Sequence, residues 1–188
     1  MSSQPSLDYL KELCLKNNTM DIIKFLDKGT ISPDLDCLKI VCKKCNTKAF
    51  YKILSFGINP DVECLNNFCL GLNEDNINSN GVLNCMKKIL KYEINLDLTC
   101  VKIILKNKNI IENSTRILMT LITHNNKLDL ECSKLLLENQ NMLLNLLQYI
   151  EVVDLECFEI LASRIYPLKN KILHKFCRVG LDLNYELL

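Results

Sequence analysis

Asp34-Leu-Asp-Cys-Leu38 and Asp61-Val-Glu-Cys-Leu65 are two copies of a phrase that recurs along this chain of 188 residues. The copies begin 25 to 36 residues apart, at Ser6, Asp34, Asp61, Asp97, Asp129, Asp154 and Asp182. A period in this range indicates an array of one supersecondary unit, in which each unit packs against its neighbours. The phrase therefore decides the fold class before any other residue is interpreted.

Each unit has the pattern of two helices. Asp34 and Asp61 both follow a proline, and Asp or Ser at such a position is a preferred N-cap. Apolar residues then recur at helical spacing for about ten residues, and a second helical pattern ends near Gly57. We therefore expect all seven phrase starts to be N-caps and each unit to be an antiparallel helical hairpin.

The ends of the second helices differ between units. Glycine, which adopts the left-handed conformation at low cost, stands at Gly29, Gly57 and Gly180, and Asn125 takes that place in the fourth unit. The third and fifth units have Glu93 and Ile150 instead. We expect those two ends to close in a different way.

These features predict an all-α solenoid. It comprises about six stacked antiparallel hairpins and a terminal half-repeat, in a single domain over residues 1–188. The stretch Cys14–Gly29 resembles an ankyrin repeat from the end of its first helix through its second, and Thr47–Pro60 is similar. The links after the glycines are too short for the ankyrin β-hairpin, so the resemblance implies ankyrin-like repeats without fingers. Degenerate repeats of this kind, rich in Asn and Lys, are common in large DNA viruses.

Composition narrows the classes of partner and compartment. The formal net charge is +1, and short basic pairs such as Lys43-Lys44 and Lys87-Lys88 are typical of a solvated face. We therefore expect no nucleic-acid partner, and no apolar run is long enough for a membrane span. Eleven cysteines without a secretory signal favour a reducing compartment, the cytoplasm, or the host cytoplasm if the chain is viral.

Five cysteines recur at the start of the first helix of a unit: Cys37, Cys64, Cys100, Cys132 and Cys157. We interpret them as small buried residues where hairpins approach closely, reduced and unligated, because thiols one repeat apart are too distant to share a metal. Cys42-Lys-Lys-Cys45 is a single CxxC pair, which is a weak zinc signal, and both positions fit the apolar face of a helix.

No catalytic or cofactor-binding residues are expected. His124 and His174 have no nucleophile or carboxylate in a catalytic spacing, and the five glycines form no phosphate-binding loop. The sequence favours a non-catalytic module that binds an unidentified protein partner through an extended surface, as a viral adaptor acting on host proteins would. One alternative is a small cysteine-rich metal-binding protein that uses Cys42 and Cys45.

A second alternative is a structural protein that self-associates through its C-terminus. The seventh phrase has no second helix after it to cover its apolar side chains, which are Leu183, Tyr185, Leu187 and Leu188. Exposed apolar groups at the end of a repeat array usually mark an association site, and a homodimer is the simplest closed form. The other interpretation is that this segment folds back and covers the second helix of the sixth unit.

Overall fold

The computed structural model describes residues 6–77, 79–94, 96–106, 111–125 and 130–137. Within these residues the chain is all-helical, with nine α-helices and no strand. The helices are α1 (Leu7–Lys16), α2 (Thr19–Asp27), α3 (Leu35–Lys43), α4 (Thr47–Leu54), α5 (Val62–Gly71), α6 (Asn80–Leu90), α7 (Leu98–Lys106), α8 (Ile111–Asn125) and α9 (Leu130–Leu137).

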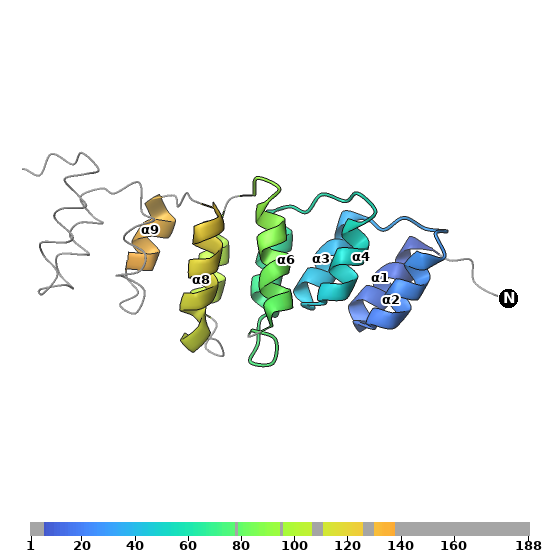
Figure 1. Ribbon diagram of the computed structural model, residues 1–188, viewed down its shortest axis with the longest axis horizontal. Coiled ribbons are helices and arrows are strands. Elements are labelled where there is room, and N and C mark those ends of the chain that lie inside the picture. Colours follow the sequence, from blue (N-terminus) through green and yellow to red (C-terminus); the bar gives the residue numbers. More distant parts are fainter. Residues whose placement is uncertain (1–5, 78, 95, 107–110, 126–129, 138–188) are drawn as a thin grey trace, which may run out of the picture.

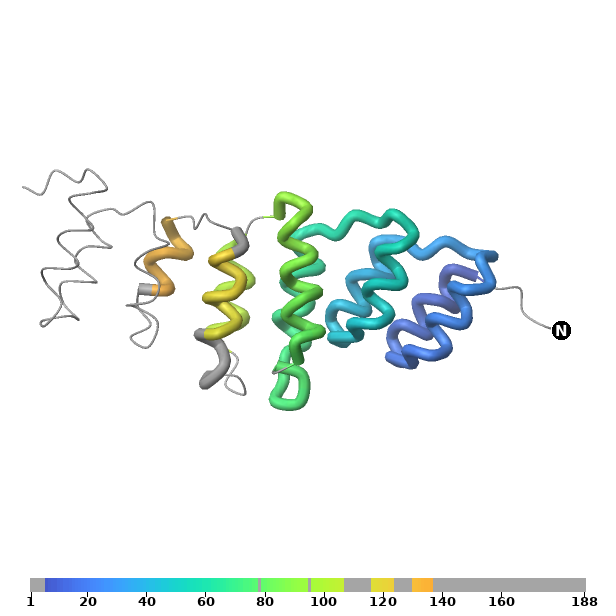
Figure 2. Tube along the Cα trace, viewed as in Figure 1, coloured from blue at the N-terminus to red at the C-terminus, as the bar shows by residue number. Residues whose placement is uncertain are grey.

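The helices are arranged in consecutive pairs (Figure 1). Only two residues join α1 to α2, and the two helices pack together, so they run antiparallel. The pairs then lie side by side along the long axis of the molecule (Figure 2). Odd-numbered helices contact one another in order from α1 to α9, and α2, α4, α6 and α8 do the same. The described residues therefore form two rows of helices.

N-caps explain why the odd-numbered helices begin where they do. The Ser6 hydroxyl accepts a hydrogen bond from the Tyr9 backbone N–H. Asp34 Oδ1, Asp61 Oδ1 and Asp97 Oδ1 accept from the backbone N–H three residues on, at 2.9, 3.0 and 2.8 Å. Each bond satisfies a backbone donor that has no partner within the helix. Asp129, Asp154 and Asp182 lie outside the described residues.

A left-handed residue follows each of α2, α4 and α6, with one correction to the sequence analysis. Gly29 has φ 66° and Gly57 has φ 82°, as expected for glycines that close a helix. Glu93 was expected to close its unit differently, yet it takes the same conformation, with φ 62°. This conformation carries a steric cost for a side chain such as that of Glu93.

The core lies between the two rows. It includes fully buried aromatic and aliphatic residues from successive pairs, and the rings of Phe50 on α4 and Phe68 on α5 meet edge to face with centroids 5.3 Å apart. Gly71, the last residue of α5, allows a close approach to α3. A Cβ atom on Gly71 would lie 2.2 Å from the carbonyl oxygen of Lys43. Only glycine fits at this contact.

Candidate interaction site

Ion pairs tie successive odd-numbered helices together. Lys11 Nζ on α1 lies 2.8 Å from Asp34 Oδ2 and 2.7 Å from Asp36 Oδ2, at the start of α3. Lys39 on α3 reaches the start of α5 in the same way, 3.0 Å from Asp61 Oδ2. The cap residues therefore have two roles, since one carboxylate oxygen caps its own helix and the other binds the preceding helix.

These contacts set the charge state of the caps. Burial opposes ionisation of Asp34, but the bonds from Lys11 and from the Cys37 backbone outweigh it and lower the pKa of Asp34. The same balance, with Lys39 and Cys64 as partners, lowers the pKa of Asp61. Both carboxylates are therefore ionised at neutral pH.

The next interface departs from this pattern. At the α5–α7 contact the equivalent of Lys11 and Lys39 is Asn66, whose Nδ2 lies 3.3 Å from Asp97 Oδ2. The Oδ1 atom of Asn66 is buried and has no hydrogen-bond partner among the described residues. The α5–α7 interface thus has a weaker polar connection than the two before it.

Asparagines cap two of the even-numbered helices. Asn18 accepts a hydrogen bond from the Asp21 backbone N–H, and Asn46 accepts one from the Ala49 backbone N–H. Asn46 also donates to Asn17 Oδ1 at 2.8 Å, which links two consecutive inter-helix turns. The sequence analysis missed these caps. In both cases the sequence signal is an Asn directly before the Thr that begins the helix, at Asn18-Thr19 and Asn46-Thr47.

The two cysteines of the CxxC pair lie in different local structures. Cys42 is fully buried in α3, whereas Cys45 lies in the turn after it with φ 51°, so the expectation that both lie on one helix face was wrong. The Cys45 thiol lies 3.7 Å from the carbonyl oxygen of Phe68. No group of three His, Cys, Asp or Glu side chains suited to a metal occurs in the described part of the chain.

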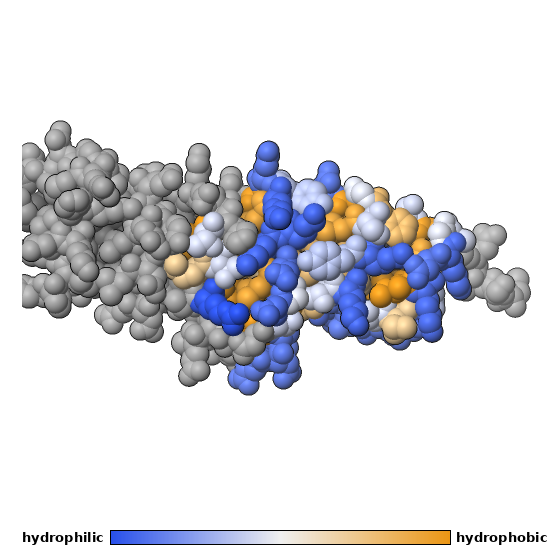
Figure 3. Space-filling view, viewed as in Figure 1, coloured by the Kyte–Doolittle hydropathy of each residue, from blue (hydrophilic) through white to orange (hydrophobic). Residues whose placement is uncertain are grey.

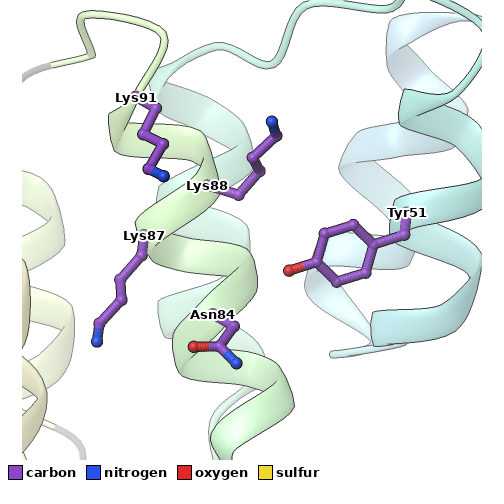
Figure 4. A pocket seen from close by; sticks show the side chains of 5 residues that line it. All are labelled: Tyr51, Asn84, Lys87, Lys88 and Lys91. Carbon is purple, nitrogen blue, oxygen red and sulfur yellow. The ribbon is translucent and has the colours of Figure 1, made fainter.

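A hollow of about 270 Å³ lies between α4 and α6. It is lined by Tyr51 on α4, by Asn84, Lys87 and Lys88 on α6, and by Lys91, which follows α6. Figure 4 shows the Tyr51 ring directed from α4 toward α6 and Lys88 extending from α6 toward α4, whereas the Lys87 amine points away from Tyr51. Hydrophilic side chains cover this part of the surface, beside hydrophobic ones (Figure 3).

The hollow is cationic. Neither α4 nor α6 contains an acidic residue. Lys52 on α4 is paired with Asp27 of α2, but no carboxylate among the described residues pairs with Lys87, Lys88 or Lys91. The sequence analysis treated Lys87-Lys88 as a solvated face. It could not place Lys91 and Tyr51 beside that pair.

Tyr51 supplies a neutral hydrogen-bonding group at the wall of the hollow. Burial, together with the neighbouring Cys85 thiol, raises the pKa of Tyr51. The hydroxyl therefore keeps its proton at neutral pH, and with the Asn84 amide it adds hydrogen-bond donors and acceptors to the lysines that line the hollow. This arrangement can bind a carboxylate-bearing segment, and the described residues supply no nucleophile with an adjacent base there.

The predicted C-terminal association residues, Leu183, Tyr185, Leu187 and Leu188, lie outside the described residues, as do His174 and Cys157. Within the described part of the chain, the helices are too short or too polar to cross a membrane. Comparisons of the chain with protein-family models, curated proteins and solved structures gave no significant match.

Proposed function

We propose that this chain is a non-catalytic protein-interaction module, an ankyrin-like helical solenoid that binds an acidic segment of a partner protein in the hollow between α4 and α6. The observation that supports it is three lysines around one hollow with no carboxylate partner among the described residues. Its walls are α4 and α6, which belong to two consecutive helix pairs and contact each other, as expected for a repeat array that binds along its length.

An acidic protein segment suits the hollow better than nucleic acid does. Nucleic-acid binding depends on neutralising many phosphates along a track, whereas the chain has a net charge of +1 and only three lysines line the hollow. A segment with a few carboxylates, flanked by groups that hydrogen-bond Tyr51 and Asn84, matches this number of charges.

The test is a titration of the full chain with a fluorescent ten-residue peptide rich in Asp and Glu, at about 50 mM salt, where screening of exposed charges is weak. The triple variant Lys87→Gln, Lys88→Gln, Lys91→Gln should weaken binding about tenfold or more. The double variant Lys43→Gln, Lys44→Gln is the matched control, because it removes an exposed Lys-Lys pair at the end of another helix, and it should change affinity less than threefold.

The outcome is decisive in either direction. Binding that the triple variant abolishes and the control retains supports the proposal. No binding of the acidic peptide at about millimolar concentration, equal losses in both variants, or tighter binding of a single-stranded oligonucleotide of equal charge would refute it.

A further inference from the structure

Cysteines occupy two related positions in the odd-numbered helices. One is the third residue after the N-cap, and the other is the eighth. The eighth-position residues are Cys14, Cys42 and Cys69, and the third-position residues of the following helices are Cys37, Cys64 and Cys100. The sequence analysis followed only the third-position thiols, which lie one repeat apart, and so missed the partner of each in the preceding helix.

The two sets meet in the core. Cys69 Sγ on α5 lies 3.0 Å from Cys100 Sγ on α7, and both side chains have no exposed surface. Cys14 and Cys37 lie close enough across α1 and α3 for each thiol to shift the pKa of the other. Burial and the Cys64 thiol on α5 likewise raise the pKa of Cys42 on α3. Three consecutive interfaces therefore each contain a pair of neighbouring buried thiols, and at the α5–α7 interface the two sulfurs are in direct contact.

The pair at the α5–α7 interface has the largest structural consequence. Here Asn66 replaces the lysine that forms the ion pair at the earlier interfaces. The two sulfurs are 31 residues apart in sequence, and the segment between them contains the whole of α6, with the lysines of the hollow. A covalent link would close this loop and fix α5 and α7, the helices before and after α6 in the chain, relative to each other.

We propose that Cys69 and Cys100 are a redox modification site, at which a peroxide converts the two thiols into a reversible disulfide that joins α5 to α7. One sulfur attacks a peroxide oxygen, the O–O bond breaks, and a sulfenic acid and one water form. The second sulfur attacks the sulfenic sulfur, the S–O bond breaks, and a second water leaves. Two thiols and one hydrogen peroxide thus yield one disulfide and two waters.

Burial makes this modification conditional. Burial and the neighbouring Cys100 thiol raise the pKa of Cys69, so the reactive thiolate is scarce while the interface is closed. Oxidation therefore requires a transient opening between α5 and α7. Once the disulfide has formed, it prevents that opening from separating the two helices.

The test treats the folded full chain with hydrogen peroxide, blocks free thiols under denaturing conditions, and identifies linked peptides by mass spectrometry after digestion without reductant. We expect the Cys69–Cys100 link to be the most abundant product and a phosphine reductant to remove it. The oxidised protein should also unfold at a higher urea concentration than the reduced protein.

Variants separate this site from general oxidation. Cys69→Ser and, in case that change impairs folding, Cys100→Ala should each abolish both the link and the urea shift. Cys85→Ala, a buried thiol outside the three pairs, should leave both unchanged. The proposal is overturned if Cys69 and Cys100 are recovered unlinked, or if links at the other two pairs predominate.

Discussion

Asp61 joins two kinds of interaction whose contributions can be separated by substitution. Its Oδ1 accepts the Cys64 backbone N–H at 3.0 Å, and its Oδ2 lies 3.0 Å from Lys39 Nζ. Losing an N-cap costs about 1 kcal/mol. The Asp61 side chain is 37% exposed, so we assign its ion pair the value of a partly exposed pair, about 0.2–1 kcal/mol.

Asp61→Ala should therefore lower the free energy of unfolding by roughly 1–2 kcal/mol. Asp61→Asn should cost less than about 1 kcal/mol, because Asn still caps the helix and only the ion pair is lost. Urea titrations at pH 7, followed by circular dichroism, measure both. A double-mutant cycle with Lys39→Met should return a coupling of about 0.2–1 kcal/mol.

Acid provides an independent check. Because the pKa of Asp61 is lowered in the folded chain, the ion pair contributes fully above the unfolded pKa of about 4. The contribution is lost as the pH falls through the folded pKa, so the stabilities of wild type and Asp61→Asn should converge at acid pH, below that pKa. Two results would contradict this reasoning. One is that Asp61→Asn lowers the free energy of unfolding as much as Asp61→Ala at pH 7, and the other is that the stability difference between Asp61→Asn and wild type does not depend on pH.

Three further substitutions have predictable signs in the same urea assay. Gly71→Ala should destabilise by about 1–3 kcal/mol, because its Cβ would collide with the Lys43 carbonyl oxygen. Glu93→Gly should stabilise by about 0.5 kcal/mol, since glycine accepts φ 62° without steric cost. Thr99 lies two residues after the cap Asp97, as Asp36 lies two residues after Asp34, so it occupies the position of the second carboxylate that pairs with Lys11. Asn66→Lys with Thr99→Glu should therefore add about 0.5–1 kcal/mol by forming the equivalent ion pairs between α5 and α7, and this gain should shrink at high salt.

Each of these has a control within the chain. Gly57→Ala, at φ 82°, should destabilise where Glu93→Gly stabilises, and matching signs would contradict the conformational argument. Asn66→Lys alone should give a smaller gain than the double variant. A tolerated Gly71→Ala would mean that α5 and α3 do not approach as closely as the structure shows.

The helical content and the starts of the first helices were predictable because they depend on local chemistry. Caps such as Asp34 act within three residues, and the apolar spacing of a single helix is visible in its own sequence. Glu93 was misjudged because only its residue type was considered, and a steric preference for negative φ does not exclude a left-handed residue at a helix end.

The candidate site was much less predictable. The hollow brings Tyr51 from α4 next to lysines on α6, and no spacing within one unit reveals a contact between two units. The Lys39–Asp61 and Cys69–Cys100 contacts have the same origin. Both contacts join non-equivalent positions of consecutive units. They would have been found by comparing the middle and end of each first helix with the start of the next first helix.

The cap ion pairs and the Cys69–Cys100 contact run in one direction, from the middle or end of one odd-numbered helix to the start of the next. The start of α5, with Asp61 and Cys64, therefore has the same acidic cap and buried thiol as the start of α3, which Lys11 and Cys14 of α1 now contact. Excising residues 34–60 would join α2 directly to α5 and leave these partners matched. Loss of this one unit by deletion would therefore leave the ion-pair and thiol contacts of the new junction chemically complementary.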